Sequence, residues 1–382
     1  MFVLRHARLD DLLDALKRRG FTLVGPVVRD GAIVYDVIAS SSDLPIGYTH
    51  QQDAGSYHLI EAHDGAFFGY TVGPHSWKQY LNPPRTRLWK AKGSANGFEI
   101  VQENANVPRY AFIGVRACEL NAIAILDRVF LQGSAVDFEY RRRREHAFIL
   151  AVDCTRPGGT CFCASMNAGP QARSGFDLAL TEVFDNGEHY FTVVCGSERG
   201  DEVLGELCLE EASEPERQAA KHSIEEAGRH MGRKMETAGL AELLASRVEH
   251  PHWEVVAKRC LTCGNCTLVC PTCFCSNVED VTDLAGAFAE RWRTWDSCFT
   301  LDYSYIHGGN VRKTAVSRYR QWLTHKLSSW HSQFEMSGCV GCGRCITWCP
   351  VGIDLTEEVR VLRDGATAVT IGTEKGVPDA KH

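Results

Sequence analysis

The chain has 382 residues, a formal net charge of −7, 44% hydrophobic and 23% charged residues, and 17 cysteines. This length predicts two or three domains with ample core, and the acidic balance argues against a nucleic-acid-binding surface. No stretch is long and apolar enough to predict a transmembrane helix, and the N-terminus, charged at Arg5, does not resemble a signal peptide. We therefore expect a cytoplasmic protein whose cysteines bind metal rather than form disulfides.

The first hundred residues are expected to form one helix and two β-hairpins. Leucines at helical spacing from Leu9 to Leu16, followed by Gly20, predict the helix. Residues 74–106 are polar and rich in turns, and they predict little else. The expected strands and turns are 21–28 and 32–38 around Asp30-Gly31, and 57–62 and 66–70 around Asp64-Gly65.

The next segment alternates strands with a helix. Residues 110–115 predict a strand that leads into a helix carrying Leu120, Ile123 and Leu126. Further strands are expected at 147–152 and, around Asn186-Gly187, at 177–183 and 189–195. Residues 202–256 are helical and polar in pattern, which is typical of a connector.

Four cysteines of this half fall near predicted strand ends. Cys118 and Cys154 each follow a strand, at the sheet edge where ligands bind in open α/β sheets. Cys161 and Cys163 lie on the loop after Cys154. The four could hold a third [4Fe–4S] cluster, but their order is not a standard ferredoxin run. Buried or reactive thiols are the alternative interpretation.

Two cysteine runs in the C-terminal part share one spacing, Cys-x2-Cys-x2-Cys-x3-Cys-Pro. This is the spacing of bacterial two-cluster ferredoxins, in which the fourth cysteine of each run ligates the other cluster. The predicted ligands are therefore Cys260, Cys263, Cys266 and Cys349 for one [4Fe–4S] cluster, and Cys339, Cys342, Cys345 and Cys270 for a second.

Gly264 and Gly343 each follow the second cysteine of a run. Because glycine lacks Cβ, it lets the backbone pass close to a cluster and adopt unusual φ angles, so both are candidate cofactor-binding residues. Structural zinc is the main alternative for these runs. It usually takes two separated cysteine pairs rather than three cysteines in a row and a fourth before proline.

The insert between the two runs also predicts helices. Apolar residues keep 3/4 spacing from Val281 to Trp295 and again from Val316 to Trp330. So long a helical insert is unlike a small free ferredoxin and resembles the α-helical ferredoxin modules of large redox complexes. Among the remaining cysteines, Cys195, Cys208 and Cys298 are expected to pack as small hydrophobic groups. Cys273 and Cys275 either contact the surroundings of the first cluster or are inert.

The expected fold class is α+β. A mixed α/β domain at 1–200, with the possible third iron–sulfur site, precedes a helical connector at 201–255. An α-helical ferredoxin-like domain with two clusters follows at 256–382. We find no glycine-rich nucleotide fingerprint and no nucleophile elbow, so no catalytic residue is predicted.

The chain resembles a known family, the iron–sulfur β subunits of cytoplasmic NADP-linked [NiFe] hydrogenases (sulfhydrogenases), which also includes the electron-transfer subunit of anaerobic sulfite reductase. The stretches that carry the resemblance are 114–120, 124–130, Asp153-Cys154, 260–275, 295–298 and 338–354. Cys-Pro-Thr-Cys-Phe-Cys at 270–275 and Trp-Asp-Ser-Cys at 295–298 are the most specific of these.

The resemblance implies a role in electron transfer. A flavin subunit would exchange electrons with NAD(P)H, and this chain would relay them to the small and large [NiFe] hydrogenase subunits. A sirohaem sulfite reductase subunit is the alternative partner, and the extended N-terminal half favours the hydrogenase. Outside the family, the chain could be an independent ferredoxin-type carrier or a zinc-stabilised interaction protein.

Overall fold

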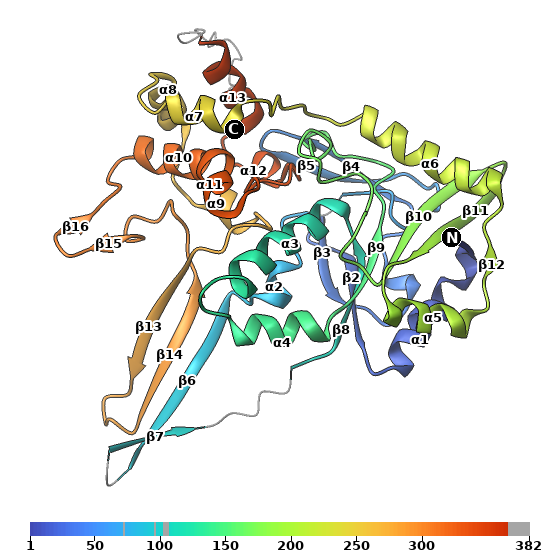
Figure 1. Cartoon of the computed structure of the whole chain (residues 1–382), viewed down its shortest axis with the longest axis horizontal. Coiled ribbons are helices and arrows are strands. Elements are labelled where there is room, and N and C mark those ends of the chain that lie inside the picture. The colour runs from blue at the N-terminus through green and yellow to red at the C-terminus, as the bar shows by residue number, and fades with distance from the viewer. Residues whose placement is uncertain (72, 95–96, 102–106, 366–382) are drawn as a thin grey trace, which may run out of the picture.

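A mixed β-sheet forms the centre of the N-terminal half in the computed structural model, which describes residues 1–71, 73–94, 97–101 and 107–365 (Figure 1). Its strands are β1 (Phe2–Arg5), β2 (Thr22–Arg29), β3 (Ala32–Val37), β8 (Tyr110–Val115), β9 (Phe148–Val152), β10 (Leu178–Asp185), β11 (Glu188–Cys195) and β12 (Glu210–Glu211). They lie in the order β12–β1–β11–β10–β9–β8–β2–β3, and neighbours from β10 to β2 run parallel. β8 and β9 are buried almost throughout, as expected for parallel strands covered on both faces.

Helices pack around this sheet. They are α1 (Leu9–Arg18), α2 (Lys78–Leu81), α3 (Ala117–Leu131), α4 (Phe138–His146), α5 (Glu198–Leu207) and α6 (Glu214–Arg229), with short 3-10 turns at His6–Arg8 and Ser41–Asp43. Leu9, Leu12, Leu13 and Leu16 are fully buried, because their 3/4 spacing places them on one face of α1. The first helix and the β2–β3 hairpin are therefore confirmed, as are the strands β8 to β11.

The second predicted hairpin is wrong. The strand β5 (Ser56–Glu61) pairs with the preceding β4 (Tyr48–Asp53) instead of with residues 66–70. The turn falls at Gly55, whose φ of +73° suits glycine. Residues 66–70 form no ladder because the buried Glu182 carboxylate accepts the N–H groups of Phe67 and Phe68 at 2.7 and 2.9 Å.

The C-terminal half is mainly helical around a second apolar core. Its helices are α7 (Leu240–Ser246), α8 (His252–Arg259), α9 (Asn265–Leu268), α10 (Ala315–Thr324), a π-helical turn η3 (His325–Ser329), α11 (Trp330–Phe334), α12 (Arg344–Thr347) and α13 (Leu355–Asp364). A short hairpin, β15 (Tyr305–Ile306) and β16 (Gly309–Asn310), precedes α10. The predicted helical pattern from Val316 to Trp330 is confirmed, since Tyr319, Leu323 and Leu327 are buried in this core.

The predicted helix at 281–295 is wrong. Residues there belong to an antiparallel sheet, seen as an arm that extends away from the body in Figure 1. Its strands are β6 (Arg85–Ser94), β7 (Gly97–Val101), β13 (Ser276–Thr282) and β14 (Phe288–Trp295), in the order β13–β14–β6–β7. The 3/4 spacing does not mark a buried helix face here, because Leu284 is fully exposed in the turn between β13 and β14. In addition, β14 pairs with β6, a strand that comes from the N-terminal half of the chain.

The arm also joins parts of the chain that the sequence assigns to different domains. Its strands come from 1–200 and from 256–382, so the division at 200 and 255 stays a prediction, and residues 366–382 lie outside the described residues. Residues 74–106, expected to be turn-rich, contain α2, β6 and β7; 95–96 and 102–106 are likewise outside the description. In the described part of the chain, no helix has the length and apolar character needed to cross a bilayer.

Candidate metal centres

The first cysteine set lies where α8 and α9 meet the end of the second run. All four predicted ligands, Cys260, Cys263, Cys266 and Cys349, line one cavity. Most of the remaining wall is apolar, and Cys263 is exposed. This site therefore lies at the protein surface.

The thiols of the first set lie close enough to influence one another. Burial raises the pKa of Cys266 well above its usual value, and Cys260, Cys349 and Cys263 raise it further. Crowded, buried thiolates are costly unless a cation neutralises them. Iron supplies that charge, so this donor set fits a [4Fe–4S] cluster.

The second set brings Cys270 of the first run to three cysteines of the second. Burial raises the pKa of Cys345 well above its usual value, and Cys339, Cys342 and Cys270 raise it further. Burial likewise raises the pKa of Cys339 to about 12, although the nearby Lys326 ammonium opposes the rise. The fourth cysteine of the first run thus lies with the second set, as crossed ligation requires.

The two glycines of the cysteine runs adopt the expected positive φ, +75° at both Gly264 and Gly343. Each begins a short helix, α9 or α12. A Cβ on Gly264 would lie 2.9 Å from Ser297 Oγ, and one on Gly343 would collide with the Thr160 carbonyl oxygen. Their bare backbone therefore permits close packing of neighbouring loops, while their contact with a cofactor stays a prediction.

The third set is assembled at the sheet edge. Cys118 is the second residue of α3, which follows β8, and Cys154 follows β9; both line one cavity together with Cys161 and Cys163. Among the described residues, no three ligand-type side chains converge tightly enough for a single metal ion. Four thiols around one cavity match the number of cysteine ligands that a cubane takes.

Three cysteines of the third set, Cys154, Cys161 and Cys163, are buried, and Cys118 is partly buried. Burial raises the pKa of Cys118 well above its usual value, and Cys163 and then Cys342 raise it further. Burial also raises the pKa of Cys161 to about 12, with Cys154 as the next cause. As in the first set, ionising these thiols requires a nearby positive charge.

Two buried arginines supply positive charge at this cavity. Arg116 and Arg344 both line it and are only 4% and 3% exposed. Arg116 donates to the carbonyl oxygens of Asp153, Phe68 and Tyr70. The guanidinium of Arg344 pairs with Glu119, yet its Nη2 has no hydrogen-bond partner within the described structure. An unpaired donor in a cavity of thiols fits an anionic cluster with sulfur acceptors.

The loop that carries Cys161 and Cys163 docks directly on the second cysteine run. The Phe162 N–H donates to the Gly341 carbonyl at 2.8 Å, and the hydroxyls of Thr160 and Thr347 are 2.7 Å apart. A Cβ on Gly341 would lie 2.7 Å from the Cys163 backbone. The second and third sets are thus held at a fixed separation.

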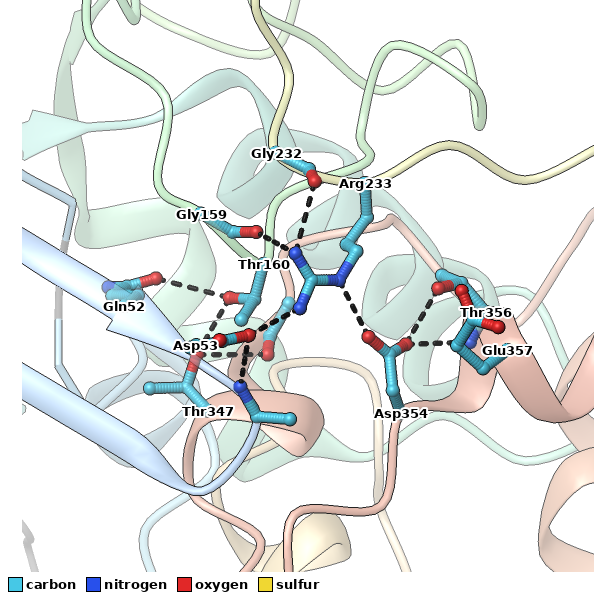
Figure 2. A network of polar contacts seen from close by, with 12 residues as sticks. Gln52, Asp53, Gly159, Thr160, Gly232, Arg233, Thr347, Asp354, Thr356 and Glu357 are labelled. Atoms are coloured by element: carbon cyan, nitrogen blue, oxygen red, sulfur yellow. Dashed lines mark hydrogen bonds and ion pairs between the residues drawn. The ribbon is translucent and has the colours of Figure 1, made fainter. Parts of the chain in front are cut away.

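The side chain of Arg233 links the segments that meet at this junction (Figure 2). Its guanidinium donates to the Gly159 carbonyl at 2.8 Å, to Asp354 at 2.7 Å and to Asp53 at 2.5 Å. These partners come from the loop of the third set, the N-terminus of α13 and the end of β4. One side chain therefore joins three segments that are far apart in the sequence.

Replacing Arg233 with methionine is expected to lower the free energy of unfolding by about 2–3 kcal/mol, because charge-assisted hydrogen bonds are lost and Asp354 loses its counter-charge. Anaerobic urea titration measures the change. Arg229→Met is the matched control, since its ion pairs lie on the exposed face of α6 and little change is expected. Equal effects of the two substitutions would contradict the junction role.

The remaining cysteines lie in the two cores, at the surface, or beside other cysteines. Cys298 packs against the C-terminal core and Cys195 against the N-terminal core, as expected. The prediction that Cys208 packs as a small hydrophobic group is wrong, because it is exposed at the end of α5. Cys273 contacts Cys270, and Cys298 lowers the pKa of Cys275 to about 6.

Sequence reasoning missed the charged residues around the cysteine sets. Arg116 and Glu119 flank Cys118, and Arg344 lies inside the second run, so adjacency to cysteine was the available signal. Lys326, whose ammonium lies 3.3 Å from Cys270 Sγ, gave no local signal. Burial opposes its charge, but the Cys270 and Cys273 thiolates outweigh that effect and hold the pKa of Lys326 well above its usual value.

Comparison with known proteins agrees with this geometry. Residues 259–353 match the family model of the 4Fe-4S dicluster domain, and the cysteine-rich C-terminal region fits [4Fe–4S] clusters. Over 358 residues it is 29% identical to sulfhydrogenase 2 subunit beta of Pyrococcus furiosus, and the match covers 93% of this chain and 96% of that protein. The resemblance to sulfhydrogenase β subunits is thereby confirmed. No solved structure matches significantly.

Proposed function

We propose that this chain is the iron–sulfur electron-transfer subunit of a cytoplasmic, NAD(P)-linked [NiFe] hydrogenase. The observation that carries the proposal is the crossed pair of cysteine sets in a chain that aligns over nearly its whole length with a sulfhydrogenase β subunit. In this role it connects a flavin subunit that binds NAD(P)H with the small and large catalytic subunits. The proposal assigns it no catalytic residue.

The proposal includes a third [4Fe–4S] cluster in the N-terminal half. Cys118, Cys154, Cys161 and Cys163 are its ligands. Their shared cavity and the two buried arginines that line it support this assignment. The unpaired Nη2 of Arg344, a donor without an acceptor among the described residues, supports it further.

The three cysteine sets follow one another in space. Cys345 of the second set borders the cavity of the first, and Cys342 borders the cavity of the third. Bound cubanes supply one-electron redox centres whose charge changes with little ligand movement. The residues of this chain would hold such centres in one continuous series, from the buried third site to the exposed Cys263.

Anaerobic isolation of the native complex through a tag on this chain tests the proposal. Nickel in the complex, with H₂-dependent reduction of NAD⁺ or NADP⁺, is the expected result. Sirohaem without nickel would reject the hydrogenase role and assign the chain to a sulfite reductase. Zinc in place of iron and acid-labile sulfide would reject electron transfer altogether.

A further inference from the structure

A buried lysine contacts one of the proposed cluster ligands. Lys326 is 6% exposed, and its Nζ donates to Cys270 Sγ at 3.3 Å and to Thr272 Oγ1 at 2.9 Å. Thr272 Oγ1 in turn donates to the Gly338 carbonyl at 2.7 Å. Thr272 Oγ1 and, at 3.4 Å, the Gly338 carbonyl oxygen therefore hold the ammonium against the sulfur.

A π-helical turn positions this lysine. Lys326 lies in the π-helical turn η3 between α10 and α11, and such turns frequently occur at functional sites. Its carbonyl accepts the Gly338 N–H at 2.7 Å, one residue before Cys339. The turn is thus tied to both cysteine runs that supply the second set.

A second buried lysine approaches the same loop from the other half of the chain. Lys78 of α2 is 3% exposed, and its Nζ donates to the carbonyl oxygens of Cys270 and Cys273, each at 3.0 Å. The same ammonium lies 3.9 Å from the centre of the Trp295 ring, in a cation–π contact. Unlike Lys326, it does not touch a sulfur.

In the described structure, no lysine or arginine is in hydrogen-bond contact with a sulfur of the first set, although burial raises the pKa of Cys260 and the Arg318 guanidinium opposes that rise. The described residues that line its cavity include neither lysine nor arginine, and its aromatic wall is formed by Phe299, Tyr319 and Trp322. Here Cys260 Sγ accepts the Thr262 N–H at 3.4 Å, a neutral donor. The two ferredoxin-type sites therefore share one ligand spacing but differ in their electrostatic surroundings.

We propose that Lys326, supported by Lys78, raises the reduction potential of the second cluster above that of the first. The proposal rests on the cluster ligands given under the proposed function. Reduction adds a negative charge to a cluster, and a buried cation beside a ligand sulfur stabilises that charge. Of the two ferredoxin-type sites, the second then holds an arriving electron in preference to the first. Lys326 is not itself a ligand. It acts on the cluster through the ligand Cys270 and is therefore a positioning residue.

A redox titration of the full, anaerobically reconstituted chain, followed by electron paramagnetic resonance, tests this proposal. Lys326→Gln keeps a donor but removes the charge. It is expected to shift one cluster's reduction equilibrium at least tenfold toward the oxidised form, a fall of about 59 mV in midpoint for one electron. Lys326→Arg is expected to keep the original midpoint. Cys270→Ser changes a ligand of the second cluster and so identifies its signal.

Controls separate charge from structure. Lys221→Gln removes an exposed charge on α6, and no midpoint should change. Lys78→Met is expected to lower the midpoint potential of the same cluster as Lys326→Gln, by a smaller amount. If Lys326→Gln does not retain its iron, the midpoint of the Lys78→Met variant tests the proposal in its place. Unchanged midpoints at full iron content, or an equal fall of all midpoints, overturn the proposal. A parent chain that binds fewer than two cubanes would instead reject the proposed function itself.

Discussion

Serine in place of Cys118 is expected to lower the iron content of the anaerobically purified chain by about four atoms, one cubane, with a matching loss of acid-labile sulfide. Cys118 lines the third cavity with Cys154, Cys161 and Cys163, and no other cysteine of the N-terminal half borders that cavity within the described structure. Colorimetric iron and sulfide assays per mole of chain give the result. Because the ferredoxin-type sets keep all their cysteines, their signals should persist.

Cys195→Ser provides the matched control for this experiment. Cys195 is partly buried in the same half but packs against the sheet core, away from the cavity. Its replacement should leave iron unchanged. Full iron content in the Cys118→Ser chain would mean that the four N-terminal cysteines are not a cluster site, and it would leave the two ferredoxin-type sets unaffected.

Glutamine in place of Glu119 is expected to destabilise the protein by about 3–5 kcal/mol, because it removes the carboxylate that pairs with the buried guanidinium of Arg344. Both side chains are almost fully buried, at 1% for Glu119 and 3% for Arg344. The pair links α3 of the N-terminal half to α12 in the second cysteine run. Breaking it therefore weakens the contact between the two halves as well as the cavity wall.

Anaerobic urea titration followed by tryptophan fluorescence measures this loss. Trp77 is a suitable reporter, because it is fully buried and its backbone N–H donates to Glu119 at 3.3 Å. Glu357→Gln is the control, since Glu357 pairs with Arg360 on the exposed face of α13 and little change is expected. An unfolding curve for Glu119→Gln that coincides with this control would show that the buried pair contributes nothing net.

The cysteine runs can be interpreted from the sequence because covalent spacing alone restricts which sulfurs reach one cluster. Spacing assigns Cys270 and Cys349 to opposite sets, and the structure brings each to the set expected of it. The third set is also foreseeable, since Cys118 and Cys154 follow adjacent parallel strands whose ends share one sheet edge. In both cases the positions of the cysteines relative to the runs or to the predicted strand ends are enough to group them.

The errors arise where a distant partner decides the structure. Residues 281–295 have helical spacing, yet they form strands because β6 offers an edge that no local window contains. Residues 66–70 are an apolar run like a buried strand, but the Glu182 carboxylate accepts the backbone N–H groups of Phe67 and Phe68. Lys326 is missed for the same reason, since its relation to Cys270 exists only after folding.

The pairing of β6 with β14 also determines when the arm can fold during synthesis. Arg85 lies opposite Thr294, on the order of 200 residues later in the chain, so at 5–20 residues per second the ribosome needs about 10–40 s to supply the partner. During that interval the nascent chain has an open strand edge, which is a site for chaperones and for pairing with other chains. Cys349 emerges later still, so neither ferredoxin-type ligand set is complete before the second run has left the ribosome. We therefore expect cofactor insertion into these two proposed sites to be a late maturation step rather than one that accompanies translation of the N-terminal half.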